Sequence, residues 1–250
     1  MKLIKAVIQA RMGSTRLPNK SLIDFNGKPM FQIIIDRIRL AKKKNCAVLL
    51  ATSENKEDDK LAEFAAKIGI ETVRGDSENV LSRFLIAEKN FPSDWTLRFT
   101  GDNPLIAFDF LEDFIDFTVS NNLDYSAIKG LPTGMGYEIY KSNKLKELCN
   151  ENLEWFCKEH VTPYFYRNPN IYKIKYFEIN SFNSNSISDF RLTIDTLEDY
   201  KVALKIHGDL ISKLKREPLT VEIIKYCENN PELLKLNSKV HQRKYDVKYV

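Results

Sequence analysis

Residues 5–20 have the sequence KAVIQARMGSTRLPNK, in which a short apolar run passes directly into a basic loop. The run at residues 5–8 is typical of a buried strand, because a loop that contains Gly13 and Pro18 ends it. Farther along the chain, short apolar runs alternate with helical patterns of roughly 10–15 residues. This alternation predicts an α/β fold, with a Rossmann-like, mainly parallel sheet and helices on both of its faces. Such sheets bind ligands outside the carboxyl ends of their strands, where the basic loop begins.

The regular alternation ends after residue 120. Beyond it, the pattern predicts four strands, at residues 124–128, 137–140, 172–178 and 190–194, and two or three helices among them, one around residues 151–166. No linker or repeat divides the chain, so we expect a single domain over residues 1–250. Within this domain, we expect residues 130–180 to form an arm that contacts an acceptor or a second subunit.

The composition excludes several classes of protein. Hydrophobic residues make up 43% of the 250 residues and charged residues 29%, the balance of a globular chain rather than a disordered or fibrous one. No run approaches the roughly 20 apolar residues of a membrane span, and the first residues are too interrupted for a signal peptide. The cysteines form no CxxC pair and are expected as thiols of a reducing compartment. We therefore expect a cytoplasmic protein that has no membrane contact.

The positive charge is unevenly distributed along the chain. The formal net charge is +4, which by itself is too weak to indicate a nucleic-acid partner, and we expect none. Residues 1–60 contain 13 Lys and Arg against 6 Asp and Glu, whereas the other residues contain 25 against 28. The excess lies at the N-terminal end, where an anion could bind.

The basic loop carries the groups that bind phosphate. Arg11 and Arg16 can each fork onto phosphate oxygens, and Lys20 adds a mobile point charge. Gly13 allows backbone N–H groups to approach an anion closely. A polyphosphate is the ligand that this loop favours, and a solvated basic loop without a ligand is the alternative. The chain contains no GxxxxGK[ST] motif and no GxGxxG after the first strand, so neither a P-loop nor a dinucleotide fold is indicated.

Two aspartates are predicted at strand ends. Asp102 follows a strand and a glycine, and Asp195 ends a later strand. Two such carboxylates beside a triphosphate suit magnesium (Mg2+), which takes one or two carboxylates together with phosphate oxygens. Each aspartate alone could equally be a turn or helix-cap residue. Thr196 and Asp199 form the pattern of a capping box, which predicts a helix after Asp195.

Six motifs give the chain a family resemblance. They are IQARMGSTRLPNK at residues 8–20, GKPM at 27–30, ATS at 51–53, TGDNPL at 100–105, EHVTPY at 159–164 and TIDTLED at 193–199. In order and spacing they resemble the cytidylyltransferases of the CMP-Kdo synthetase and acylneuraminate cytidylyltransferase group, in particular the branch named after spore-coat polysaccharide biosynthesis. The resemblance covers most of the chain.

The resemblance implies a fold of the nucleotide-diphospho-sugar transferase type with a small mixed dimerisation arm, and a homodimer. It also implies an enzyme that transfers CMP from CTP to a sugar or sugar-like acceptor and releases pyrophosphate, for surface glycan biosynthesis. Two alternatives stay open: a nucleotidyltransferase of the same fold that uses another nucleoside triphosphate, and a non-enzymatic nucleotide-binding domain.

Carried over onto this sequence, the resemblance implies roles for individual residues. The catalytic group is Arg11, Arg16, Lys20 and Asp102. The Mg2+ ligands are Asp102 and Asp195. The nucleotide-binding group is Gln9, Ala10, Gly13, Ser14, Ser53, Arg74, Ser82 and Gly101. The acceptor-binding group is Glu138 and His160.

The acceptor-binding group is the least determined of these. Members of this branch commonly have a further acidic residue before Val-Glu in the middle segment, and here Gly136-Tyr137-Glu138 keeps only Glu138. This departure leaves the identity of the acceptor open. His160 also has a second interpretation, as a hydrogen-bonded core histidine.

Overall fold

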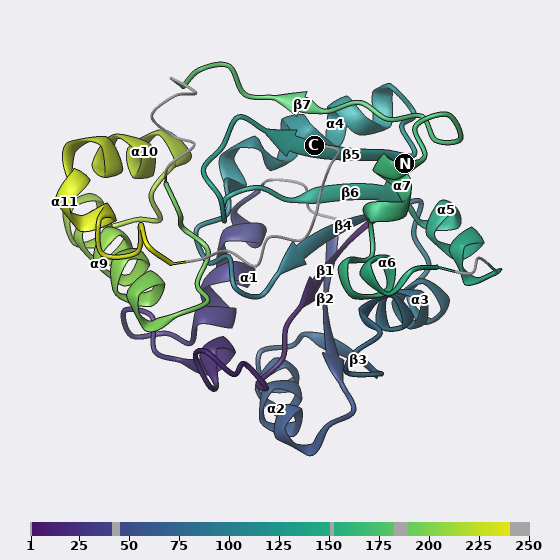
Figure 1. The fold of residues 1–250 in the computed structure, drawn as a ribbon, viewed down its shortest axis with the longest axis horizontal. Helices are drawn as coiled ribbons and strands as arrows, with labels where there is room; N and C mark the ends of the chain where they lie inside the picture. The colour runs from purple at the N-terminus through teal and green to yellow at the C-terminus, as the bar shows by residue number, and fades with distance from the viewer. Residues whose placement is uncertain (1, 42–45, 151–152, 183–189, 241–250) are drawn as a thin grey trace.

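The structure is a computed structural model that describes residues 2–41, 46–150, 153–182 and 190–240 (Figure 1). Its strands form one seven-stranded sheet in the order β3-β2-β1-β4-β6-β5-β7. The strands are β1 (Ile4–Gln9), β2 (Cys46–Ser53), β3 (Glu71–Gly75), β4 (Trp95–Thr100), β5 (Tyr125–Lys129), β6 (Glu138–Lys141) and β7 (Phe177–Glu178). Neighbouring strands are parallel except where β6 pairs with β4 and β5. The predicted mainly parallel sheet is thus confirmed.

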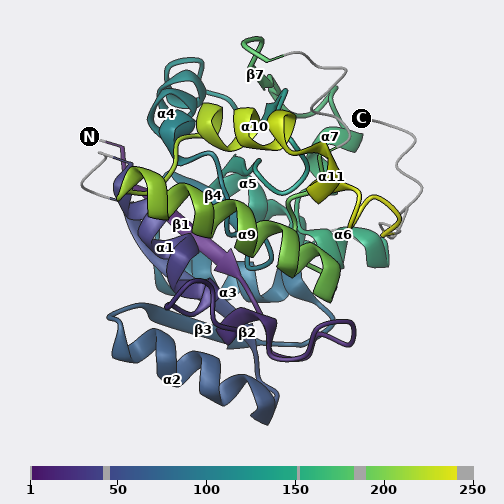
Figure 2. The same ribbon diagram turned by 90° about the vertical axis from the view of Figure 1, so that its left-hand side faces the viewer.

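Helices cover both faces of the sheet, as predicted. Because side chains alternate along a strand, Ala6 and Ile8 of β1 enter one hydrophobic core and Val7 enters the other. The first core includes residues of α1 (Met30–Leu40), α2 (Asp59–Lys67), α4 (Leu111–Ser120), α9 (Leu197–Leu214) and α10 (Thr220–Asn229). The second includes residues of α3 (Val80–Asn90), α5 (Ser142–Glu147), α6 (Trp155–His160) and α7 (Pro163–Arg167). Figure 2 shows α9 and α10 side by side, with the short α11 (Pro231–Leu234) after them.

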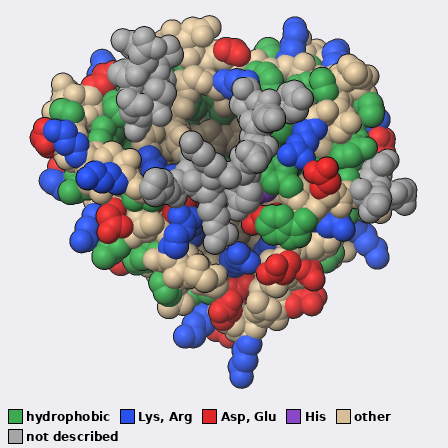
Figure 3. All heavy atoms as spheres, in the orientation of Figure 1, with side chains coloured by type: hydrophobic (Ala, Val, Ile, Leu, Met, Phe, Trp, Pro, Cys, Tyr) green, Lys and Arg blue, Asp and Glu red, His purple; other side chains and the backbone are tan. Residues whose placement is uncertain are grey.

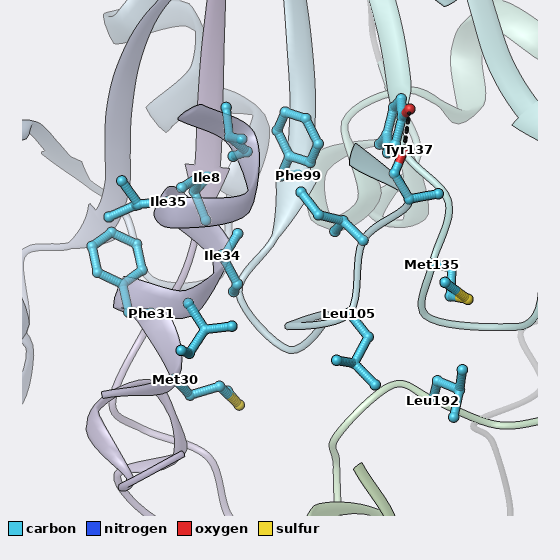
Figure 4. Close-up of a cluster of buried hydrophobic side chains, with 14 of the residues drawn as sticks. Ile8, Met30, Phe31, Ile34, Ile35, Phe99, Leu105, Met135, Tyr137 and Leu192 are labelled. Carbon is cyan, nitrogen blue, oxygen red and sulfur yellow. Dashed lines mark hydrogen bonds between the residues drawn. The ribbon is translucent and has the colours of Figure 1, made fainter. Parts of the chain in front are cut away.

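The first core fixes the end of the sheet from which the basic loop leaves. Phe31 and Ile34 of α1 lie on the same side as Ile8 of β1 and Phe99 of β4, and all four side chains are almost completely buried (Figure 4). Burying an apolar side chain of this size stabilises the fold by roughly 1.5–3 kcal/mol. The carboxyl ends of β1 and β4 therefore have well-defined positions.

Three local predictions were wrong. Residues 190–194 form no strand: Leu192 and Ile194 donate their N–H groups to the carbonyls of Thr133 and Asp102, which lie in loops. Only an isolated bridge pairs Arg191 with Thr133. Residues 172–178 form only part of the predicted strand: the two-residue β7 and an isolated bridge between Ile174 and Tyr125.

The third concerns the helix predicted around residues 151–166. Two short helices, α6 and α7, replace it in the part that the structure describes. The break falls at Val161, whose φ of 69° lies in the left-handed region. Pro163 then starts α7, because proline has no N–H and is tolerated only in the first turn of a helix.

The segment predicted as an arm is in part integral to the sheet. β6 lies between β4 and β5, and α5, α6 and α7 pack on one face. Within the described part of the chain, no helix combines the length and the apolar character that crossing a bilayer requires.

Candidate active site

A cavity of about 540 Å³ opens at the carboxyl ends of β1 and β4. From β1 the chain proceeds through β2 and β3 to one side of the sheet, and β4 then pairs on the other side of β1. This reversal of strand order is where parallel α/β sheets bind their ligands. The cavity is lined by the loop after β1, the loop after β4, the start of α3, residues of α6 and the segment around Asp195.

The loop after β1 is fixed from below by a buried carboxylate. Asp58 is fully buried and accepts a hydrogen bond of 2.6 Å from the backbone N–H of Met12. Its other oxygen accepts bonds from the N–H and the hydroxyl of Ser53. The hydroxyl of Ser21 donates to the carbonyl of Arg11 at 3.1 Å. The loop is therefore ordered before any ligand arrives.

Gly101 brings the loop after β4 against the loop after β1. Its N–H donates to the carbonyl of Gln9 at 2.8 Å. A Cβ atom at residue 101 would lie 2.5 Å from the Cβ of Ala10, closer than two carbon atoms can approach. Glycine is thus required here for the two loops to touch.

Four cationic side chains line the cavity, and together they are called the basic wall: Arg11, Arg16, Lys20 and Arg83. Arg11 donates to the carbonyl of Ser77 at 3.2 Å, across the cavity mouth from its own loop. Arg16 lies 3.2 Å from Oδ1 of Asp195. Lys20 lies 3.1 Å from the same oxygen and 3.7 Å from Oδ2 of Asp102.

Asp102 and Asp195 converge on the single ammonium of Lys20. Burial alone would raise the pKa of Asp195, but the charges of Lys20, Arg16 and Arg191 outweigh it and hold this pKa below its ordinary value. The structure contains no group of three or more His, Cys, Asp or Glu side chains arranged for a metal among the described residues. Two carboxylates around one positive charge nevertheless fit Mg2+, which takes its other ligands from phosphates and water. Asp102 and Asp195 are the residues that would hold it.

A buried network fixes Asp195 from behind. Arg191 donates to Oδ2 of Asp195 at 2.8 Å and to Oδ1 of Asp199 at 3.0 Å. Asp199 accepts bonds from the N–H groups of Asp195 and Thr196, and the predicted capping box of α9 is present. Asn237, which is also buried, donates to Oδ1 of Asp199 at 3.0 Å. The carboxylate of Asp195 is thus held in one orientation.

The structure brings most of the predicted site residues together. Those that line the cavity are Gln9, Ala10, Arg11, Gly13, Ser14, Arg16, Lys20, Gly101, Asp102, His160 and Asp195. Four others, Ser53, Arg74, Ser82 and Glu138, do not line it. Each of these four is bonded to the scaffold around the site.

Three of the four belong to the nucleotide-binding group. Ser53 is buried and holds Asp58 beneath the basic loop. Arg74 donates to the carbonyl of Ser53 at 2.9 Å and pairs with Asp59 at 2.6 Å. Ser82 bonds to Asn79, the residue that caps the start of α3. Their side chains support the cavity from outside.

Glu138 lies beneath the cavity and links the sheet to α6 and α7. It forms an ion pair of 2.5 Å with Arg98, which in turn donates to the side chain of Gln9 at 3.0 Å. The hydroxyls of Tyr125 and Thr162 also donate to Glu138, at 2.6 and 3.0 Å. Protein groups therefore occupy its carboxylate. Through Thr162, which lies between α6 and α7, this carboxylate also fixes the junction of the two helices.

A second side of the cavity, called the α6 wall, consists of Trp155, Glu159 and His160. Nε2 of His160 lies 3.6 Å from Oε2 of Glu159, and its ring packs against Phe156 with centroids 4.6 Å apart. Burial and the nearby charge of Arg98 lower the pKa of His160 to about 4. The imidazole is thus neutral at physiological pH.

Arg83 and Trp155 are among the lining residues to which the sequence prediction gave no role. Arg83 is almost fully buried, and its Nε has no hydrogen-bond partner among the described residues. Burial and the charge of Arg11 lower the pKa of Arg83 to about 10, so the guanidinium stays protonated. The sequence held one signal for Arg83: it lies in the first turn of the helix that follows β3, and such helix starts face the ligand site at the carboxyl ends of the strands. Trp155 gave no such signal, because its helix was predicted with the wrong boundaries.

On the face drawn in Figure 3, Lys and Arg side chains are interspersed with Asp and Glu side chains over the described part. No continuous basic band crosses that part of the face, although nucleic-acid grooves commonly have one.

The fold and this site are those of a nucleotidyltransferase: an α/β sheet with a cavity at its switch point, where four cations lie beside Asp102 and Asp195. A family model described as cytidylyltransferase matches residues 5–239, and the chain belongs to this family. An uncharacterized protein of Methanocaldococcus jannaschii is 35% identical over 98% of both chains. The spore coat polysaccharide biosynthesis protein SpsF of Bacillus subtilis is 32% identical over 85% of this chain and 94% of its own. A cytidylyltransferase structure from Leptospira borgpetersenii superposes with a TM-score of 0.83 at 31% identity, over 98% of this chain and 100% of that one.

Proposed function

We propose that the protein transfers CMP from CTP to an oxygen of a sugar or sugar-like acceptor and releases pyrophosphate. One observation carries this proposal: the basic loop and the carboxylates of Asp195 and Asp102 meet at Lys20, whose ammonium lies 3.1 Å from Asp195 and 3.7 Å from Asp102. A nucleoside triphosphate requires this combination, with cations for its phosphates and carboxylates for its metal. The relative named for spore coat polysaccharide biosynthesis supports an acceptor destined for a surface glycan.

In the proposed reaction, the acceptor oxygen attacks the α-phosphorus of CTP in line with the departing pyrophosphate. The protein mainly has to position two substrates and neutralise charge. Arg11, Arg16 and Lys20 hold the phosphates and stabilise the charge that develops on the leaving pyrophosphate. Arg83 supplies a further contact to CTP, because it is a buried cation in the cavity whose Nε lacks a protein partner.

Asp102 and Asp195 would hold Mg2+. When bound, this ion neutralises phosphate charge and stabilises the leaving group. The network of Arg191, Asp199 and Asn237 keeps Asp195 oriented for that role. Gln9, Ala10, Gly13, Ser14 and Gly101 shape the nucleotide site.

For the four predicted residues outside the cavity, we propose positioning roles in place of direct contacts. Ser53, Arg74 and Ser82 support the basic loop and the start of α3. Glu138 fixes the segment that carries His160, through Thr162. The homodimer, the arm at residues 130–180 and the cytoplasmic location belong to the same proposal.

Calorimetric titration with CTP, UTP, GTP and ATP, each with and without Mg2+, tests the proposal. We expect CTP to bind most tightly and its affinity to fall without Mg2+. The variant Asp102→Asn should keep its fold and lose the Mg2+-dependent part of the affinity. Equal affinity for all four nucleotides would favour a different nucleotide specificity on the same fold. Binding that ignores Mg2+ and falls steeply with salt would favour a non-enzymatic nucleic-acid-binding domain.

A further inference from the structure

Gln9 places a neutral amide at the point where the sheet passes into the basic loop. It is the last residue of β1, its side chain is half-buried, and it lines the cavity. Because side chains alternate along a strand, Gln9 lies on the same face of β1 as Val7, which enters the core with α3 and α6. The cations of the loop begin two residues later, at Arg11. A ligand held by those cations therefore passes close to the Gln9 amide.

The orientation of this amide is determined by Arg98. Nε of Arg98 donates a hydrogen bond to Oε1 of Gln9 at 3.0 Å, and Arg98 itself lies outside the cavity lining. A guanidinium has donors only, so turning the amide round would set two donors against each other. Among the described residues, the NH2 group of Gln9 has no partner of its own. Gln9 therefore offers the cavity a donor and keeps its acceptor for the protein.

Arg98 is held in turn by Glu138. The register of β4 and β6 sets the two residues opposite each other, and they form an ion pair of 2.5 Å in which both side chains are mostly buried. The hydroxyls of Tyr125 and Thr162 donate to the same carboxylate, at 2.6 and 3.0 Å. Little ordering of the Gln9 amide is therefore needed when a ligand arrives.

From this chain of contacts we infer that the NH2 group of Gln9 donates a hydrogen bond to an oxygen of bound CTP, and that Arg98 and Glu138 are positioning residues that act through Gln9. The inference rests on the proposed function. CTP carries acceptor oxygens on its phosphates, ribose and base, whereas its donors are the exocyclic amino group and the ribose hydroxyls. A fixed donor therefore suits this ligand better than a fixed amide oxygen would.

Calorimetric titration of the full chain with CTP and Mg2+ tests the contact. Gln9→Met keeps the length of the side chain and removes its donor, so the affinity should fall about three- to tenfold, the size of one neutral hydrogen bond. Gln32→Met is the matched control, because Gln32 lies outside the cavity and donates to Asp36. The control should bind CTP as wild type does.

Gln9→Glu tests whether the group that meets CTP is a donor. This variant replaces the NH2 group by a carboxylate oxygen, which would face an oxygen of CTP, so the affinity should fall more than in Gln9→Met, by at least about tenfold. The new carboxylate also faces the guanidinium of Arg98. The urea midpoint of Gln9→Glu should therefore be no lower than that of wild type, which separates lost binding from lost folding.

Arg98→Lys tests the positioning role. It keeps a positive charge beside Glu138 and removes the guanidinium that orients the amide. The affinity for CTP should fall about threefold or more when Gln9 is present, and less than about twofold in Gln9→Met, where no amide remains to be oriented. Equal losses in the two backgrounds would show that Arg98 acts independently of Gln9 and would overturn the positioning role.

Two further results would overturn the contact itself: an unchanged affinity for CTP in Gln9→Met, or wild-type affinity in Gln9→Glu. If wild type did not bind CTP at all, the proposed function would be wrong and this inference with it. Binding by wild type together with either of the two results contradicts this inference alone.

Discussion

The basic wall and the α6 wall of one cavity are built in different ways. The basic wall comes mainly from the segment Ala10 to Lys20 that directly follows β1, which supplies three of its four cations and brings them close to Asp102 and Asp195. The α6 wall comes from a helix of six residues that ends at a left-handed Val161, and the described residues give it no cation. The difference separates two parts of the cavity: one concentrates cations beside Asp102 and Asp195, and the other presents an indole, a carboxyl group and an imidazole.

The largest expected effect is on the basic wall, at Lys20. Lys20→Ala removes the ammonium that lies between Asp102 and Asp195. We propose that this ammonium stabilises the negative charge of the leaving pyrophosphate. Turnover should fall about a hundredfold or more, since such contacts contribute roughly 3–4 kcal/mol to the transition state. Steady-state pyrophosphate release measures it. Lys28→Ala is the matched control, because Lys28 is 56% exposed and paired with Asp36 outside the cavity. A fall in turnover of less than about tenfold in Lys20→Ala would contradict the proposal that the basic wall acts in the reaction.

The second effect tests whether Asp195 needs its supporting network. Asp199→Asn keeps the shape of a fully buried side chain but removes the charge opposite Arg191. We expect the free energy of unfolding to fall by about 3 kcal/mol and half-maximal activity to require more Mg2+. Urea unfolding and a Mg2+ titration measure the two quantities. Glu232→Gln, at a pair with Lys235 in which both side chains are mostly exposed, should change neither. Loss of stability with an unchanged Mg2+ requirement would mean that the network is structural only.

The third effect concerns the charge of the α6 wall. The pKa of His160 is about 4 in the folded protein and near 6.5 in the unfolded chain, so the unfolded chain binds more protons between these pH values. The free energy of unfolding should therefore decrease as the pH falls from 6.5 to 4, by about 2 kcal/mol once partial exposure is allowed for. Urea unfolding of wild type and His160→Gln across this range isolates the contribution. Identical pH profiles would show that His160 titrates normally, and the wall would then carry a positive charge at pH values below about 6.5.

The smallest effect is at Trp155. Trp155→Ala should raise the KM for the acceptor about fivefold, the size of one aromatic contact of about 1 kcal/mol, and leave the KM for CTP unchanged. Trp155→Phe, which keeps an aromatic ring, should lose less. Steady-state kinetics with each substrate varied in turn separates the two constants. A rise in the KM for CTP would place the nucleotide, and not the acceptor, on this wall.

The sequence predicts the basic wall better than the α6 wall for a physical reason. Gln9 to Lys20 follow a buried strand without interruption, so the order of residues alone places their side chains at one end of the sheet. Asp102 and Asp195 also stand directly after extended segments. By contrast, the break at Val161 depends on Thr162 bonding to Glu138 of β6, a contact between distant parts of the chain. Trp155 could not be assigned while that break was unknown.

The same limit applies to Ser53, Glu138 and the fold beyond residue 120. Ser53 and Glu138 were predicted to contact ligands because of the motifs around them. In the structure, Ser53 bonds to Asp58 and Glu138 pairs with Arg98. Residues 190–194 have the apolar pattern of a strand, but their backbone groups bond to the loops at Asp102 and Thr133. The residue pattern predicts whether a segment is extended or helical. Its contacts with distant parts of the chain determine where it lies and what it pairs with.

The most direct test of the two-wall account is the stabilisation of three proteins by CTP with Mg2+: wild type, Lys20→Ala and Trp155→Ala. At a hundred times the dissociation constant, a ligand that binds only the folded state adds about 2.7 kcal/mol to the free energy of unfolding. The account predicts this gain in wild type and in Trp155→Ala, and its loss in Lys20→Ala. Equal gains in all three proteins, or a loss confined to Trp155→Ala, would contradict the assignment of the triphosphate to the basic wall.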